Sequence, residues 1–229
     1  MNIVDIKRKL RKNKLVNNIV KQYYSSKHKK QVLLLQKNGY QTNEEIFSCL
    51  AGKLEYMAWA GTLLGVIREN GFIKGDDDLD YCVRAETQSD WNLLYKVLTN
   101  QGYKLKHYFK YNGTITEMAF MKDGLSVDFF GLLPFEKGSS VIIFYRDPSE
   151  KYGSHEASCI RIVFTPYTSL SERRIHNSTF YVPDNYSHLL EANYGPGWTT
   201  PQTVSYTQAL GSRRFMPDEH GTIGYRWND

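Results

Sequence analysis

The stretch AGTLLGVIRENGFIKGDDDLDYCV, residues 60–83, carries a small-residue turn, one arginine and four aspartates. The aspartates stand at positions 76, 77, 78 and 80. Two ionised carboxylates about 4 Å apart repel each other by about 1 kcal/mol in water and by about 4 kcal/mol near a protein surface. If this segment folds with its carboxylates close together, a cation must offset the repulsion; otherwise the segment stays exposed to solvent.

A strand is predicted over 78–83, because apolar residues at positions 79, 81 and 83 alternate with the others. This alternation places Asp78 and Asp80 on one face, and Asp76 shares their parity. Asp128 lies within another apolar run, where an unpaired carboxylate would be costly. Carboxylates from two strands form an oxygen-rich site suited to Mg²⁺ or Mn²⁺. We predict Asp78, Asp80 and Asp128 as metal ligands and catalytic residues.

The turn before this strand predicts phosphate binding. Gly61 and Thr62 offer backbone N–H groups and a hydroxyl near an expected helix start, and Arg68 could clamp a phosphate oxygen. An acidic run alone is more often a solvated loop, so the prediction depends on the ordered combination. Asp76 is expected to assist the site, and Asp77 is expected to be a spectator.

Other segments predict a mixture of helices and strands. Thr42 and Glu45 have the spacing of a capping box, which predicts a helix starting at Asn43. The Asp123-Gly124 pair predicts a hairpin turn. The C-terminal third is predicted as loops around one helix. Helices are predicted over 43–53, 63–70, 89–100 and 186–192, and further strands over 55–60, 103–108, 115–121, 125–133, 141–145 and 161–164.

The start of the chain is strongly basic. Residues 1–43 carry eleven Lys and Arg against Asp5 alone, whereas the remainder is net acidic. Apolar residues interleave there at helical spacing, which predicts a basic helical arm over 1–41 beside a single catalytic domain over 42–229. The arm is either a solvated helix or a contact with an anionic membrane through residues 5–37, where each Lys or Arg contributes about 1 kcal/mol. Nucleic acid is the least favoured partner.

Length and composition limit the class of protein. A chain of 229 residues, 41% hydrophobic, suffices for one substantial core. No apolar run approaches the ~18–20 residues that cross a bilayer, and the basic start lacks a signal-peptide pattern. We therefore expect a cytoplasmic protein, with the arm as a candidate for peripheral contact at the inner face of the membrane. The three cysteines and six histidines show no metal or triad spacing, so none is assigned a role.

Residues 61–83 resemble the signature of the LicD and fukutin family, which runs roughly GTLLGaxRhxgfIPWDDDxDi. The similarity continues at LSVDFFGL around Asp128 and at VPDNYSHLLEANYGPGWTTP, so it covers residues 46–201. Two departures stand out: Lys74-Gly75 replaces the usual Pro-Trp, and Glu69-Asn70 stands where a His-Lys pair is common. The departures leave the predicted metal ligands intact and change the surroundings of the pocket.

The resemblance implies an α+β fold with a nucleotidyltransferase-like (polymerase-beta-type) mixed sheet flanked by helices. The basic helical arm and the loop-rich C-terminal segment predicted above complete the expected architecture. The resemblance also implies Mg²⁺-dependent transfer of phosphocholine from CDP-choline to a cell-surface glycan, such as a lipopolysaccharide, teichoic acid or capsule precursor, with a lipid-linked acceptor as one candidate. Gly61 and Thr62 would contact the donor phosphates, and Arg68 falls on the arginine of the family. Tyr194 and Trp198 match its closing element and are candidates for a substrate-pocket wall.

Three alternatives stay open at this point. The donor is CDP-ribitol or CDP-glycerol in the nearest alternative. In the second, the same carboxylates serve a nucleotidyltransferase that adds NMP to a protein, an RNA or a small molecule. The third is a non-catalytic nucleic-acid binder led by the basic arm, which leaves the aspartate pattern unexplained.

Overall fold

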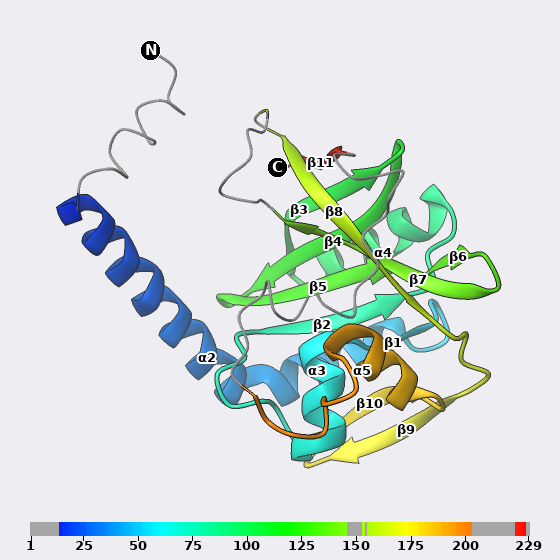
Figure 1. Cartoon of the computed structure of the whole chain (residues 1–229). Coiled ribbons are helices and arrows are strands. Elements are labelled where there is room, and N and C mark those ends of the chain that lie inside the picture. The colour runs from blue at the N-terminus through cyan, green and yellow to red at the C-terminus, as the bar shows by residue number, and fades with distance from the viewer. Residues whose placement is uncertain (1–13, 146–152, 154, 203–222, 228–229) are drawn as a thin grey trace.

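The computed structural model of the chain describes residues 14–145, 153, 155–202 and 223–227 (Figure 1). Within these residues, helices cover a mixed sheet that dominates the fold, and a two-stranded hairpin lies beside it. The helices are α2 (Lys14–Leu50), α3 (Ala60–Leu64), the π-helix η1 (Gly65–Glu69), α4 (Gln88–Asn100) and α5 (Tyr186–Tyr194). The strands are β1 (Tyr56–Ala58), β2 (Asp78–Val83), β3 (Lys104–Tyr111), β4 (Thr114–Lys122), β5 (Leu125–Gly131), β6 (Leu133–Phe135), β7 (Gly138–Tyr145), β8 (Glu156–Phe164), β9 (Leu170–Ile175), β10 (Ser178–Pro183) and β11 (Ile223–Trp227).

The main sheet has the strand order β1-β2-β5-β4-β3-β11-β8-β7-β6. Only β2 and β5 pair in parallel among its described strands, and the remaining neighbours are antiparallel. The sheet curls so strongly that β7 also approaches β4 and β5. Figure 1 shows β7 and β8 crossing in front of β4 and β5. The inner side of this curl is the place where a pocket can form. The mixed α+β class predicted from the sequence is confirmed.

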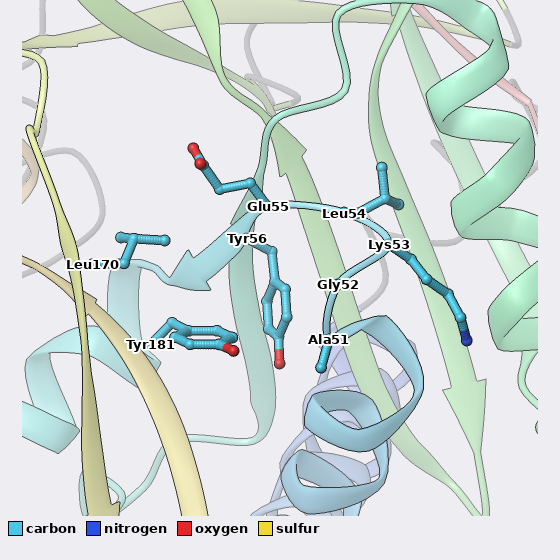
Figure 2. A pocket seen from close by; sticks show the side chains of 8 residues that line it. All are labelled: Ala51, Gly52, Lys53, Leu54, Glu55, Tyr56, Leu170 and Tyr181. Atoms are coloured by element: carbon cyan, nitrogen blue, oxygen red, sulfur yellow. The ribbon is translucent and has the colours of Figure 1, made fainter.

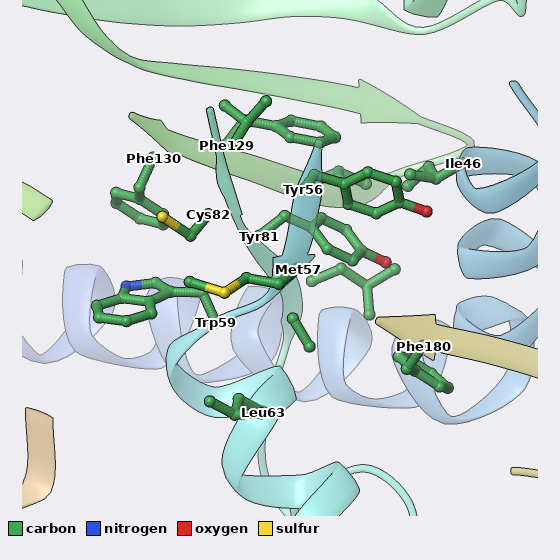
Figure 3. Packing of buried hydrophobic residues seen from close by; sticks show 14 of the residues in the cluster. Ile46, Tyr56, Met57, Trp59, Leu63, Tyr81, Cys82, Phe129, Phe130 and Phe180 are labelled. Atoms are coloured by element: carbon green, nitrogen blue, oxygen red, sulfur yellow. The ribbon is translucent and has the colours of Figure 1, made fainter. Parts of the chain in front are cut away.

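The outer face of β2 and β5 carries the hydrophobic core. Leu79 and Val127 are fully buried there, and the rings of Tyr81 and Phe129 stack with their centroids 5.3 Å apart. Helix α2 packs against β2 and β5, and α4 packs against the neighbouring strands β3 and β4. Figure 3 shows the cluster, in which Met57 lies beside Tyr81 and Trp59. Because successive residues of a strand face opposite sides, burying 79 and 81 forces 78 and 80 to the inner face.

Helix α2 corrects one prediction. It runs without interruption from Lys14 to Leu50, so the helix does not start at Asn43, and the capping box expected at Thr42 and Glu45 does not form. Glu45 instead accepts hydrogen bonds from Lys122 and Tyr103. The Thr42–Glu45 capping signal does not start a helix, because the residues before it are already helical. The division into an arm over 1–41 and a domain over 42–229 stays a prediction, and α2 crosses that boundary. Residues 1–13 of the arm lie outside the described residues.

The second half of α2 is held by a buried polar contact. Asn43, which is 1% exposed, donates to the Ser178 hydroxyl at 2.6 Å and to the Thr179 carbonyl at 2.7 Å. Its carbonyl accepts from the Tyr81 hydroxyl at 2.7 Å. A buried amide is stable only when its donors and acceptors are satisfied, so Asn43 fixes how α2 meets both β2 and β10.

The structure corrects the predictions for the Gly61–Thr62 turn and for the C-terminal third, and it confirms one hairpin and two helices. The tight turn expected at Gly61 and Thr62 is instead the start of α3, which begins at Ala60. The C-terminal third contains the hairpin β9–β10 and a longer β8, and not only loops around one helix. The hairpin β4–β5 is confirmed, with Asp123 and Gly124 both at positive φ as a two-residue hairpin turn requires. Helices 89–100 and 186–192 are confirmed as α4 and α5 within two residues at each end.

None of the described helices is both long and apolar enough to cross a membrane. The three cysteines are free thiols and all are buried.

Candidate active site

Three carboxylates meet on the inner face of the sheet, and we call Asp78, Asp80 and Asp128 the acidic trio. The parallel register of β2 and β5 places Asp80 opposite Asp128 and Asp78 opposite Ser126. One carboxylate oxygen from each residue of the trio lies within 4.8 Å of the other two. The two separate acidic signals in the sequence therefore converge in space, as the strand alternation predicts.

The acidic trio opens into a cavity of about 370 Å³. Its floor is the inner face of β2, β5 and β4, and its far wall is formed by apolar residues of β7 and β8. Ala60, at the start of α3, lines the rim and has a φ of +42°, a strained value for a residue that is not glycine. The lining comprises Trp59, Ala60, Asp78, Asp80, Glu117, Asp128, Phe130, Ile143, Phe144, Ile162, Asn193 and Tyr194.

The surroundings of the trio disfavour negative charge. Burial, followed by the neighbouring carboxylates Asp128 and Asp76, raises the pKa of Asp78 to about 8. Burial and the adjacent Asp78 raise the pKa of Asp80 well above its usual range. Burial also raises the pKa of Asp128, and the nearby Lys106 ammonium opposes that rise. A divalent cation would offset this repulsion, and three converging carboxylate oxygens fit the preference of Mg²⁺ or Mn²⁺ for oxygen ligands.

Short-range contacts hold Asp80 in place. The Asp80 backbone N–H donates to the Thr62 hydroxyl at 2.9 Å, and the Gly61 N–H donates to the Asp80 carboxylate at 3.3 Å. Thr62 is 1% exposed, so this hydrogen bond to the backbone of β2 is buried. The order Gly-Thr at the start of α3 thus positions a carboxylate of the trio. The predicted contact of Gly61 and Thr62 with donor phosphates stays a prediction.

Asp128 is held by a chain of polar contacts. Lys106 donates to the Ser126 hydroxyl at 3.0 Å, and that hydroxyl donates to Asp128 at 2.9 Å. A β-bulge between Leu105 and His107 makes this possible, because an extra residue in β3 locally reverses the alternation of side chains. The bulge brings Lys106 and His107 to the same inner face.

Asp76 and Asp77 precede β2 and extend the acidic region. Burial raises the pKa of Asp76 to about 6, and its Oδ2 atom is buried without a hydrogen-bond partner among the described residues. Oxygens of Asp76, Asp77 and Asp78 also lie within 4.8 Å of one another. Asp77 contacts the His28 ring of α2 at 2.9 Å, so it links the arm to the acidic loop. The close approach of Asp76 requires a glycine at 61, where a Cβ atom would lie 2.6 Å from its Oδ2.

Of the remaining predicted site residues, Tyr194 lies in the cavity of the trio, and Arg68 and Trp198 contact each other outside its lining. Tyr194 lines the cavity of the trio together with Asn193. Arg68 does not line it: its guanidinium donates to the Trp198 carbonyl at 3.0 Å and to Glu69 at 2.7 Å. Arg68 therefore joins η1 to the segment after α5. Roles of Arg68, Tyr194 and Trp198 in substrate binding stay predictions.

Sequence reasoning missed Glu117, His107 and Arg226. Glu117 lines the cavity from β4 and is 5% exposed. It stands within an apolar strand, which is the same signal that identified Asp128 and could have found it. His107 was set aside for lack of a motif. Arg226 lies 119 residues from His107 in the chain, and no local pattern links the two.

A second cavity, of about 340 Å³, lies where α2 ends and β1 begins (Figure 2). Leu170 and Tyr181 of the β9–β10 hairpin line it together with residues 51–56. The Tyr56 hydroxyl is buried there and has no hydrogen-bond partner among the described residues. No member of the acidic trio lines this cavity.

The fold and the site define an α+β domain that holds a buried cluster of carboxylates in a pocket. Residues 53–185 match the profile of the LicD/FKTN/FKRP nucleotidyltransferase domain, which is more than half of the chain. The chain belongs to this family, and the resemblance expected from its motifs is confirmed. Membership indicates a phosphotransferase that acts on glycans. A comparison with curated proteins gives no match.

Proposed function

We propose that this protein is a Mg²⁺-dependent transferase that moves phosphocholine from CDP-choline onto a cell-surface glycan precursor. The observation that carries the proposal is the acidic trio, which lies in a pocket of a LicD-family domain. We also propose that the sheet is of the nucleotidyltransferase (polymerase-beta) type. The parallel β2–β5 pair, which carries all three carboxylates on one face, supports this.

Asp78, Asp80 and Asp128 would hold the metal, with Asp76 beside them. Bound Mg²⁺ supplies charge neutralisation at the phosphate oxygens. The protein contributes the position of the ligands, through the Thr62 contact to Asp80 and the Ser126 contact to Asp128. Apolar side chains on β7 and β8 form the opposite wall of the pocket. Tyr194 would contact the substrate at the end of α5.

The test measures CMP release from CDP-choline in the presence of Mg²⁺ and a glycan acceptor. Asp78→Asn, Asp80→Asn and Asp128→Asn should each abolish release, because each removes a charged ligand with little change of shape. Asp123→Asn is the matched control, since Asp123 is an exposed turn residue at a φ that asparagine tolerates. Full activity in the trio variants would contradict the proposed mechanism.

A donor panel and product masses separate the alternatives. CDP-ribitol and CDP-glycerol are assayed beside CDP-choline, and the preferred donor names the transferred group. If the product gains a nucleotide and not the head-group phosphate, the protein is a nucleotidyltransferase and the transfer proposal fails. Nucleic-acid binding that survives loss of the trio and weakens steeply with salt would indicate the third alternative.

The arm supports a further part of the proposal. Lys27, Lys29 and Lys30 are exposed where α2 projects away from the sheet (Figure 1). We propose that this end contacts an anionic membrane surface, which would keep the enzyme near a lipid-linked acceptor. Vesicles containing phosphatidylserine should retain the protein at low salt, and Lys27, Lys29 and Lys30 changed together to Gln should weaken retention by about 3 kcal/mol. Equal retention on neutral vesicles would contradict the proposal.

A further inference from the structure

The polar surface of the sheet continues past the acidic trio onto three more strands. Glu117 of β4 lies opposite Phe109 of β3, and Phe109 lies opposite Arg226 of β11. Residues that pair across neighbouring strands share a face, so Glu117 and Arg226 both belong to the face of the trio. His107, two residues before Phe109, belongs to it as well. The face thus runs from carboxylates on β2, β5 and β4 to basic groups on β3 and β11.

The three added residues contact one another in a chain. Arg226 Nη2 lies 2.9 Å from His107 Nδ1, and His107 Nε2 lies 3.6 Å from Glu117 Oε1. The Arg226 guanidinium also lies over the Phe109 ring, 5.8 Å from its centroid. His107 and Glu117 are 6% and 5% exposed. We call Arg226, His107 and Glu117 the relay.

The hydrogen bond from Arg226 determines which ring nitrogen of His107 carries hydrogen. A guanidinium has donors and no acceptor, so His107 Nδ1 must accept its hydrogen bond. Burial, together with Arg226 and Lys106, lowers the pKa of His107 to about 3, so the ring is neutral at physiological pH. A neutral ring that accepts at Nδ1 carries its hydrogen at Nε2. That N–H faces the Glu117 carboxyl group across 3.6 Å, a packing contact longer than a hydrogen bond.

Glu117 is suited to bind a particular kind of group. Its carboxyl group lines the same cavity as the acidic trio, on the side of the basic groups. Burial, followed by the neighbouring Asp128, raises the pKa of Glu117 well above its usual range, so the carboxyl group favours the protonated form. A protonated carboxyl group both donates and accepts hydrogen bonds, which suits it to a hydroxyl partner. A buried carboxyl group that faces a polar cavity has the arrangement of a specificity residue.

We propose that Glu117 binds a substrate hydroxyl group beside the transferred phosphate, and that His107 and Arg226 are positioning residues that hold it. The inference rests on the proposed function and adds to it the residue that recognises a polyol. The hydroxyl belongs either to the glycan acceptor or to the CDP-linked donor. Arg226 lies outside residues 53–185, so the C-terminal strand completes a site that the family domain does not contain by itself.

The relay is tested first without any substrate. Nitrogen-15 NMR of the histidine side chains, with His107 assigned from the His107→Gln variant, should show a neutral ring with hydrogen at Nε2 near pH 7. Arg226→Met should convert part of His107 to the other tautomer, whereas Arg226→Lys, which keeps a donor, should preserve the wild-type signal. A charged His107, or hydrogen at Nδ1 in the wild type, would overturn the relay.

The second test separates the two sources of the hydroxyl. With CDP-choline, CDP-ribitol and CDP-glycerol as donors and p-nitrophenyl galactoside and N-acetylgalactosaminide as acceptors, KM and kcat are measured for Glu117→Leu and Arg226→Met. Loss of a hydrogen bond between neutral groups should lower kcat/KM about 2- to 10-fold. If KM rises for the acceptor alone, the acceptor supplies the hydroxyl; if it rises for the donor alone, the donor does.

Two surface variants and a Mn²⁺-binding measurement distinguish loss of substrate binding from general damage to the protein. Glu172→Leu and Arg174→Met, on the exposed part of β9, should leave both KM values unchanged. Mn²⁺ should bind Glu117→Leu within about twofold of wild type, because Glu117 is not part of the trio. Kinetic values for Glu117→Leu equal to those of Glu172→Leu would refute the proposal. A wild type that releases no CMP contradicts the proposed function alone, since the histidine spectra still test the relay.

Discussion

Replacing Asp78 by Asn should stabilise the metal-free protein. A carboxylate oxygen of Asp78 lies within 4.8 Å of one from Asp80 and one from Asp128. At that separation and an effective dielectric constant of about 20, two ionised carboxylates repel by about 3 kcal/mol. Retained protons relieve part of this repulsion. We therefore expect Asp78→Asn to add about 1–3 kcal/mol, which corresponds to about 2–12 °C in Tm for a domain of this size.

The gain should depend on pH with a definite sign. The pKa of Asp78 is raised to about 8 in the folded protein, whereas the unfolded chain has a value near 3.9. The folded state therefore retains a proton that the unfolded state loses, so wild-type stability falls as the pH rises from about 4 to about 8. The advantage of Asp78→Asn should be absent near pH 4 and complete near pH 8.

The assay is thermal unfolding of wild type, Asp78→Asn and the control Asp123→Asn, each with EDTA and with Mg²⁺. In EDTA near pH 8 the Asp78 variant should melt above wild type, and Mg²⁺ should reverse the order, because only the intact trio gains from the cation. The reasoning is refuted if Asp78→Asn melts below wild type in EDTA, or if Mg²⁺ raises both Tm values equally.

Three other substitutions test how the site is held. Asn43→Ala should cost about 2–3 kcal/mol in urea unfolding, because the buried Tyr81 hydroxyl loses its acceptor; a loss below about 0.5 kcal/mol would contradict this. Gly61→Ala should lower Tm by the equivalent of about 1–3 kcal/mol, since its Cβ would meet Asp76 at 2.6 Å, and an unchanged Tm would show that the loop yields freely. His28→Ala should change the free energy of unfolding by less than about 0.5 kcal/mol, because the contact is largely exposed; a larger loss by calorimetry would mean that the arm is held more firmly.

The acidic trio was predictable because each of its carboxylates has a local signal. Alternation within residues 78–83 places Asp78 and Asp80 on one face, and Asp128 stands within an apolar run. The parallel pairing of β2 with β5, which brings Asp128 beside Asp80, is a long-range property that only the structure shows. The start of α2 was not predictable from Thr42 and Glu45, because a capping signal acts only where no helix precedes it. Buried positions at Leu35 and Ile46 show that the arm and the core share one helix.

The contacts of the relay could not be predicted from the sequence for a different reason. His107 and Arg226 have no distinctive pattern in their own strands, and their contact forms only when β11 pairs between β3 and β8. A pairing between residues 107 and 226 is a consequence of sheet order, which local patterns do not encode. Glu117 alone had a usable signal, as a carboxylate between Thr116 and Met118 in a buried strand.

The continuity of α2 has a mechanical consequence. At about 1.5 Å per residue, Lys27 stands about 12 Å along the helix axis from Leu35, which is fully buried in the core. No hinge separates the basic end from the pocket within the described part of this helix. Any surface that captures the lysines would set both the height and the tilt of the pocket above it. The helix would act as a fixed strut, and lengthening it by one residue would also rotate the pocket by about 100° relative to that surface.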